Sequence, residues 1–75
     1  MKYKIQIEQM LEDRFKEMEE PWMDEQDKID LRRLSLAKMA EQGITLKKMN
    51  EQIETGVANG YSVERQIAII REFIC

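Results

Sequence analysis

The side chains of this sequence that could do chemistry are mainly carboxylates. The chain has 15 Asp and Glu residues among 75, and six of them crowd between residues 17 and 27. Carboxylate oxygens are the ligands that calcium and magnesium prefer. Residues 20–24 read Glu-Pro-Trp-Met-Asp, however, without the alternating Asp or Asn ligands and the pivotal glycine of a calcium loop. We therefore interpret these acids as a solvated face and predict no metal site.

The residues needed for enzymatic catalysis are mostly missing. The sequence has no histidine, which is the commonest general base and metal ligand. Its single cysteine, Cys75, stands last, where we expect no fixed surroundings that would activate a thiolate. The glycines Gly43, Gly56 and Gly60 do not form a phosphate-binding loop. We predict a protein that is not an enzyme and uses no cofactor.

Charge is distributed unevenly along the chain. Residues 8–30 hold ten acids and three bases, whereas residues 31–75 hold seven bases and five acids, for a formal net charge of −3. A dense acidic segment can steer the chain toward a basic surface on a partner. It can equally be a solvated face that keeps a small protein monomeric. Both interpretations stay open on the sequence alone.

The acidic segment surrounds the only tryptophan, Trp22, which follows Pro21 in a predicted turn. A tryptophan on a turn either covers the core or anchors a partner, because Trp is enriched at binding hot spots. If it is an anchor, the partner-binding residues are Glu17, Glu19, Glu20, Trp22, Met23, Asp24, Glu25 and Asp27.

The first predicted helix covers residues 5–19. Its apolar residues recur at i, i+4, i+8 and i+11, which places them on one side of a helix. They are Ile7, Leu11, Phe15 and Met18. The alternation of Tyr3, Ile5 and Ile7 with polar residues is also typical of a strand. The alternative is therefore a short strand at residues 2–8, which would require a second copy of the chain as its partner.

The second predicted helix covers residues 25–42. Asp24 is a good N-cap, and Gly43 is a plausible residue just past the C-terminus. The apolar residues of this segment spread almost around the helical wheel. A helix that is apolar on most sides is typically a central one, so we predict that this helix packs against several neighbours.

Two further helices follow, capped by Thr45 and Ser62. Gly56, Asn59 and Gly60 are predicted to separate them. The apolar stripes of these helices are Leu46, Met49, Ile53 and Val57, and then Val63, Ile67, Ile70 and Ile74. These four segments predict an all-α fold, a small bundle of about four short helices in one domain over residues 1–75.

The last helix has more apolar surface than one stripe requires. Ile69 and Phe73 form a second line beside Ile70. Either this helix is the most buried one, or Ile69 and Phe73 protrude and make a self-association or partner contact.

Residues 29–55 resemble a helix-turn-helix. A turn with Gly43, the apolar Ile44 and the cap Thr45 between two helices is what that motif needs. The sequence departs from the motif at Met39, where a small alanine usually stands. The resemblance implies a DNA-binding transcriptional regulator whose contacts come from Arg33, Lys47 and Lys48.

Electrostatics oppose that alternative. The recognition helix would cover residues 46–55, and its outward side mixes Lys47 and Lys48 with Glu51 and Glu54. DNA affinity depends on neutralising phosphates, and nucleic-acid-binding domains are usually basic, whereas this chain has a pI near 5.0.

The sequence favours a small non-enzymatic protein–protein interaction module. We expect a stoichiometric inhibitor or adaptor that binds a macromolecular partner through its acidic surface, with a nucleic-acid-binding protein as one candidate partner. The acids would then imitate nucleic acid. No apolar run is long enough to span a membrane, and a lone cysteine is typical of a reducing compartment, so we expect a cytoplasmic protein. Regulators of this size are frequent in phages and mobile elements, and a homodimer stays open.

Overall fold

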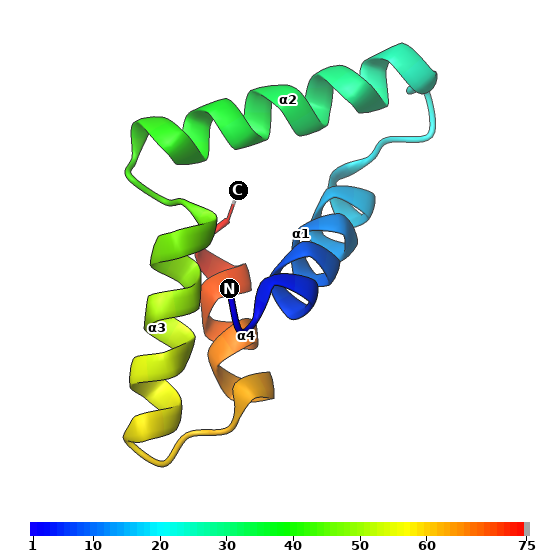
Figure 1. Cartoon of the computed structure of the whole chain (residues 1–75). Coiled ribbons are helices and arrows are strands. Elements are labelled where there is room, and N and C mark those ends of the chain that lie inside the picture. The colour runs from blue at the N-terminus through cyan, green and yellow to red at the C-terminus, as the bar shows by residue number, and fades with distance from the viewer. Residues whose placement is uncertain (75) are drawn as a thin grey trace.

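A computed structural model describes residues 1–74 and contains four α-helices (Figure 1). They are α1 (Lys4–Met18), α2 (Glu25–Glu41), α3 (Leu46–Ala58) and α4 (Val63–Phe73). The predicted all-α bundle of four short helices is thereby confirmed. Its boundaries lie within one residue of those expected, except that α3 continues past the predicted break at Gly56. Cys75, for which the sequence predicts no activated thiolate, lies outside the described residues.

The alternative of a strand at residues 2–8 is wrong. Helix α1 begins at Lys4, and the N–H of Ile7 donates to the carbonyl of Tyr3 at 3.0 Å, which is the i to i−4 bond of an α-helix. Tyr3 and Ile7 are therefore one turn apart on the same side, and both are buried, whereas Ile5 is exposed. No strand occurs among residues 1–74.

The predicted caps are confirmed. The carboxylate of Asp24 accepts from the N–H of Asp27 at 2.9 Å, and the Asp27 side chain accepts in return from the N–H of Asp24, a capping box that satisfies two orphan donors. Thr45 and Ser62 cap α3 and α4 in the ordinary way. Gly43 follows α2 with a φ of 76°, a left-handed conformation that costs glycine little.

Helices α1, α3 and α4 pack against one another, and we call them the three-helix core. The predicted stripes of these helices mostly point inward, with Val57 as an exposed exception. Residues from the predicted stripes make up most of the buried apolar cluster, to which Tyr3, Met10 and Met39 are additions. Its members are Tyr3, Ile7, Met10, Leu11, Phe15, Met39, Met49, Ile53, Ile70 and Ile74.

Gly56 lies inside α3 and is not the helix break that its position next to Asn59 predicts. A Cβ built on Gly56 would overlap the amide end of the Gln66 side chain, which is buried against it. A larger residue at position 56 would therefore require the Gln66 side chain to move. The break itself falls at Asn59 and Gly60.

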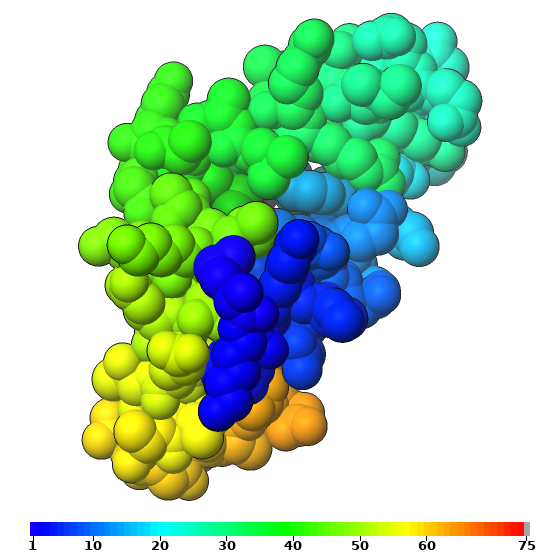
Figure 2. Space-filling model, in the orientation of Figure 1, coloured from blue at the N-terminus to red at the C-terminus, as the bar shows by residue number. Residues whose placement is uncertain are grey.

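Helix α2 is not the central helix that its apolar residues predict. Only Ser35 and Met39 of its 17 residues are buried, and Ile29, Leu34 and Leu36 are 54%, 66% and 46% exposed. In Figure 1 this helix crosses above the three-helix core, and in Figure 2 its N-terminal end projects beyond the rest of the molecule. Apolar residues that spread around a helix are therefore compatible with a helix that has few neighbours as well as with a central one.

Helix α4 is not the most buried helix, because its second apolar line faces outward. Phe73 is 70% exposed and Ile69 is partly exposed, while Ile70 and Ile74 carry the contact with the core. The extra apolar surface of α4 therefore protrudes from the bundle.

Candidate interaction surface

A tight turn between α1 and α2 directs Trp22 outward. Glu19 leaves α1 with extended backbone, as expected near a proline. The N–H of Met23 then donates to the carbonyl of Glu20 at 3.1 Å, which closes a β-turn with Pro21 and Trp22 at its tip. The Trp22 side chain is 71% exposed. The alternative in which Trp22 covers the core is therefore wrong.

Two of the predicted partner-binding acids are engaged within the chain. Glu17 forms ion pairs with Arg71 of α4 and with Arg14. Glu19 lies 3.0 Å from the guanidinium of Arg32 and 3.9 Å from Nζ of Lys28. These carboxylates hold helices together, and a partner would have to compete with those cations for them.

The other predicted acids surround Trp22 in two different states. Asp24 and Asp27 are exposed or half-buried, but their oxygens serve the capping box of α2. Glu20 and Glu25 are exposed and pair with no cation among residues 1–74. We call Glu20, Trp22, Asp24 and Glu25 the acidic corner. It is the part of the predicted set that can meet a partner directly, whereas Met23 is half-buried.

Helix α2 is fastened to α1 by charge rather than by apolar packing. The guanidinium of Arg32 lies 2.7 Å from the Glu12 carboxylate and also reaches Glu19. The hydrogen bond from Arg32 holds the pKa of Glu12 below its ordinary value of 4.5. The same contact raises the pKa of Arg32. At the other end of α2, Met39 enters the core.

The cations of the helix-turn-helix alternative do not form one surface with a clear positive sign. Lys47 and Lys48 are exposed in the first turn of α3. Arg33 lies two turns before the end of α2, and its guanidinium is 2.8 Å from Asp30. Met39, at the position where the motif favours alanine, is buried. In Figure 1 α2 crosses above the other three helices, and it has little contact with α3.

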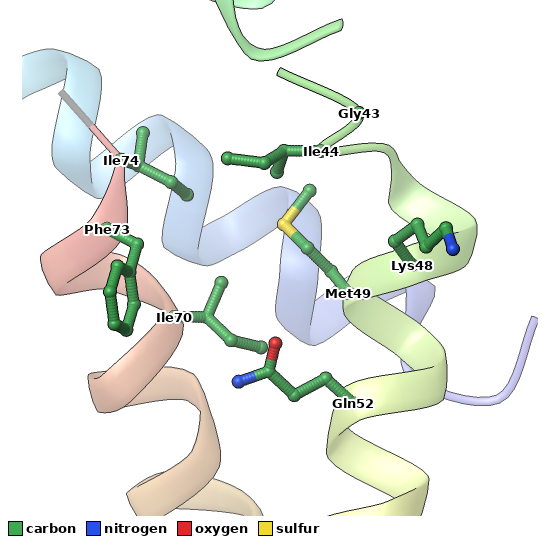
Figure 3. Close-up of a pocket in the computed structure, with 8 residues that line it drawn as sticks. All are labelled: Gly43, Ile44, Lys48, Met49, Gln52, Ile70, Phe73 and Ile74. Atoms are coloured by element: carbon green, nitrogen blue, oxygen red, sulfur yellow. The ribbon is translucent and has the colours of Figure 1, made fainter.

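An apolar groove that the sequence patterns do not reveal lies between the α2–α3 turn, α3 and α4. Its volume is about 330 Å³, and in Figure 3 Ile44, Met49, Ile70 and Ile74 converge on it with Lys48 at the rim. The remaining lining residues are Gly43, Gln52 and Phe73. Two segments far apart in sequence, residues 43–52 and 70–74, build this groove. The predicted stripes contain Met49, Ile70 and Ile74, but they do not show that these residues border a groove.

A more open groove of about 520 Å³ lies between α1 and α4. Its lining is mostly charged, and the Glu17–Arg71 ion pair crosses it. Among residues 1–74, no three acidic side chains gather closely enough to hold a metal ion. In the same part of the chain, no helix has the length and apolar character to cross a membrane.

Comparison with known proteins gives no relative: no family model, no curated protein and no solved structure matches this chain. The features of this chain that bear on function are therefore the acidic corner, the exposed surface of α2 and the groove.

Proposed function

We propose that this chain is a non-enzymatic protein–protein interaction module whose acidic corner binds a basic surface on a macromolecular partner. The observation that carries the proposal is the exposed indole of Trp22 at the tip of the turn between α1 and α2. Such a module acts by occupying a partner, either as a stoichiometric inhibitor or as an adaptor.

The placement of Trp22 supports an anchor role on energetic grounds. The fold gains little from this side chain, since most of its apolar surface remains in water. Burying it in a partner's pocket would recover that surface, and the rigid indole loses little conformational entropy in the process. The hydrogen-bonded turn, in which Pro21 has a fixed φ, presents the indole in one direction. Together these features match the buried aromatic anchors that dominate binding energy in interfaces.

The carboxylates around Trp22 support a basic partner. Glu20 and Glu25 have no competing cation within residues 1–74, and Asp24 adds a third negative charge. Charges at the rim of an interface mainly raise the association rate and select the partner. The partner class that we propose is nucleic-acid-binding proteins, because their binding surfaces are usually basic.

The experiment is a pull-down of tagged protein from the lysate of its native host, with and without nuclease. We expect a defined protein partner that survives nuclease treatment and is lost with Trp22→Ala. We expect Trp22→Ala to reduce the free energy of partner binding by about 2 kcal/mol, which raises the Kd about 30-fold. Phe73→Ala is the matched control, because Phe73 is an equally exposed aromatic that lies on α4, away from the turn of Trp22.

Trp22 also gives a direct readout in solution because it is the only tryptophan. Its emission should shift to the blue when the purified partner is added, as the indole leaves water. Equal binding by the Trp22→Ala and wild-type proteins would remove the anchor from the proposal. Recovery of nucleic acid alone, lost on nuclease treatment and on replacement of Lys47 and Lys48, would support the helix-turn-helix alternative instead.

A further inference from the structure

The chain has an exposed indole and an unfilled apolar groove at opposite ends of α2. Trp22 lies on the turn before α2, next to the end that projects beyond the rest of the molecule in Figure 2. The apolar groove begins at Gly43, just after the other end of α2. Helix α2 has 17 residues, which makes it about 25 Å long. Because the helix keeps its two ends apart, Trp22 cannot reach the groove of its own chain.

We propose that the apolar groove receives Trp22 of a second copy of the chain. The contact joins two different surfaces, the acidic corner of one copy and the groove of the next, so it is heterologous. Contacts of this kind repeat from copy to copy and build open chains unless the rotation between copies closes a ring.

The apolar groove has the size and the lining that an indole needs. Its volume of about 330 Å³ lies at the low end of the range for small-ligand sites, about 300–1,000 Å³. Ile44, Met49 and Ile70 converge on its interior in Figure 3. Phe73 also lines the groove and is 70% exposed, so an inserted indole would form an aromatic pair with it. One contact would then remove two exposed aromatic side chains from water.

The charges of the two surfaces are complementary. Lys48 is the only charged residue among residues 1–74 that lines the groove, and no acid in that range pairs with it. Insertion of Trp22 brings Glu20 and Glu25 to the rim, where the flexible side chain of Lys48 lies. Opposite charges at a rim favour such a pairing. Glu51 lies one turn farther along α3 and does not line the groove.

The expected self-association is weak. One inserted side chain and its rim form a small interface, and interfaces below about 1,200 Å² are typical of transient complexes. We expect a dissociation constant on the order of 100 μM. The contact uses only surfaces of this chain, so it does not depend on the proposed function. One consequence does rest on that function: if a partner also buries Trp22, partner binding and self-association exclude each other.

The first test follows the purified chain from low micromolar to millimolar concentration. Analytical ultracentrifugation should show an apparent mass that rises above the 9.0 kDa of one chain. The emission of Trp22, the only tryptophan, should shift to the blue over the same range as the indole leaves water. Trp22→Ala should abolish the rise in mass.

Two neighbouring lysines provide a matched comparison for the groove. Lys48→Glu should weaken self-association at least about fivefold, because like charges then meet at the rim. Lys47→Glu makes the same change at another exposed residue in the first turn of α3. Lys47 does not line the groove, and salt screens exposed charges away from a contact. At physiological salt its replacement should therefore change the dissociation constant less than about twofold.

A mixture of two variants tests the pairing directly. The Trp22→Ala chain keeps its groove, whereas a chain with Lys48→Glu and Gln52→Glu keeps its Trp22 and has two carboxylates in the groove. Lys48 and Gln52 are both exposed, so the far-ultraviolet circular dichroism of that chain should match that of the wild type. Neither variant should self-associate, but together they should form a one-to-one dimer. Only the second chain contains tryptophan, and its emission should shift to the blue in the mixture.

The proposal fails on any of three outcomes. A single-chain mass at millimolar concentration would show that Trp22 and the groove do not meet. Self-association that survives Trp22→Ala would place the contact elsewhere on the chain. An unchanged emission in the mixture of variants would show that the groove does not receive the indole.

Failure of this proposal and failure of the proposed function are separable. Phe73→Ala removes an aromatic side chain from the groove, so it should weaken self-association while leaving partner binding in the pull-down intact. A partner that is lost with Trp22→Ala would support the proposed function even if the purified chain stays a single chain at every concentration.

Discussion

The three-helix core and helix α2 use similar residues in opposite ways. In α1, α3 and α4 most of the large apolar residues concentrate on one side, and that side is buried. The exceptions are Ile5, Val57, Ile69 and Phe73. In α2 comparable residues point in several directions, and the helix buries only Ser35 and Met39. The number of apolar residues is thus a poor guide to burial, whereas their concentration on one side is a good one.

The two regions are also stabilised by different forces. Apolar packing stabilises the core, together with a buried hydrogen bond from the N–H of Tyr3 to Oδ1 of Asn50 at 3.0 Å. Helix α2 depends on its capping box and on the ion pairs of Arg32 with Glu12 and Glu19. Partly exposed ion pairs contribute little to stability in water. Helix α2 should therefore open before the core unfolds.

The largest expected contrast comes from one substitution made in both regions. Leu11→Ala removes a buried side chain of the core and should lower the free energy of unfolding by about 2–5 kcal/mol. Leu34→Ala truncates an exposed side chain of α2 and should change it by less than about 0.5 kcal/mol. Chemical denaturation at low protein concentration measures both values.

Chains of this size have only about 3–5 kcal/mol of stability, so Leu11→Ala could unfold the protein outright. Its circular dichroism would then show a loss of helix before any denaturant is added. Comparable losses for Leu34→Ala and Leu11→Ala would mean that α2 packs on the core, contrary to the structure.

Local sequence signals predicted most of the fold because they act within a few residues. Asp24, Thr45 and Ser62 each form a hydrogen bond with a backbone N–H three residues ahead. Gly43 and Gly60 each adopt a positive φ just after a helix. Gly56 has the same residue type but lies inside α3 beside the buried side chain of Gln66, a contact with α4 that local signals do not show.

The candidate site was predictable in composition but not in its connections. The acidic segment and Trp22 are visible in the sequence, and Trp22 is exposed. The engagement of Glu17 with Arg71 and of Glu19 with Arg32 is not visible, because these partners lie 54 and 13 positions away. Long-range pairing therefore reduced the predicted partner surface to the acidic corner, and it built the groove that the sequence did not reveal.

A smaller contrast is expected from the helix caps. Thr45→Ala removes the cap of a core helix and should lower the global free energy of unfolding by about 1 kcal/mol. Asp24→Ala removes a similar bond from α2, but the cost should appear mainly as local opening. Native-state hydrogen exchange should show faster exchange of α2 amides, with the slowest core amides nearly unchanged.

The cap comparison has a clear adverse outcome. If Asp24→Ala lowers the global stability as much as Thr45→Ala does, then α2 and the core unfold as one unit. Asp24→Ser would serve as a control, because serine is also a good N-cap and should keep the α2 amides protected.

The smallest expected contrast is a dependence on pH that is confined to α2. The pKa of Glu12 lies below its ordinary value of 4.5 in the folded chain, so the folded state binds this proton less readily than the unfolded state does. The Glu12–Arg32 contact therefore stabilises the fold above pH 4.5 and loses that contribution as the pH falls through the lowered pKa. Because the contact joins α2 to α1, protection factors of α2 amides should decrease over that interval more than those of core amides such as Ile53. Glu12→Gln should remove this difference, since glutamine does not titrate. An unchanged difference in the Glu12→Gln protein would assign the acid sensitivity of α2 to another group.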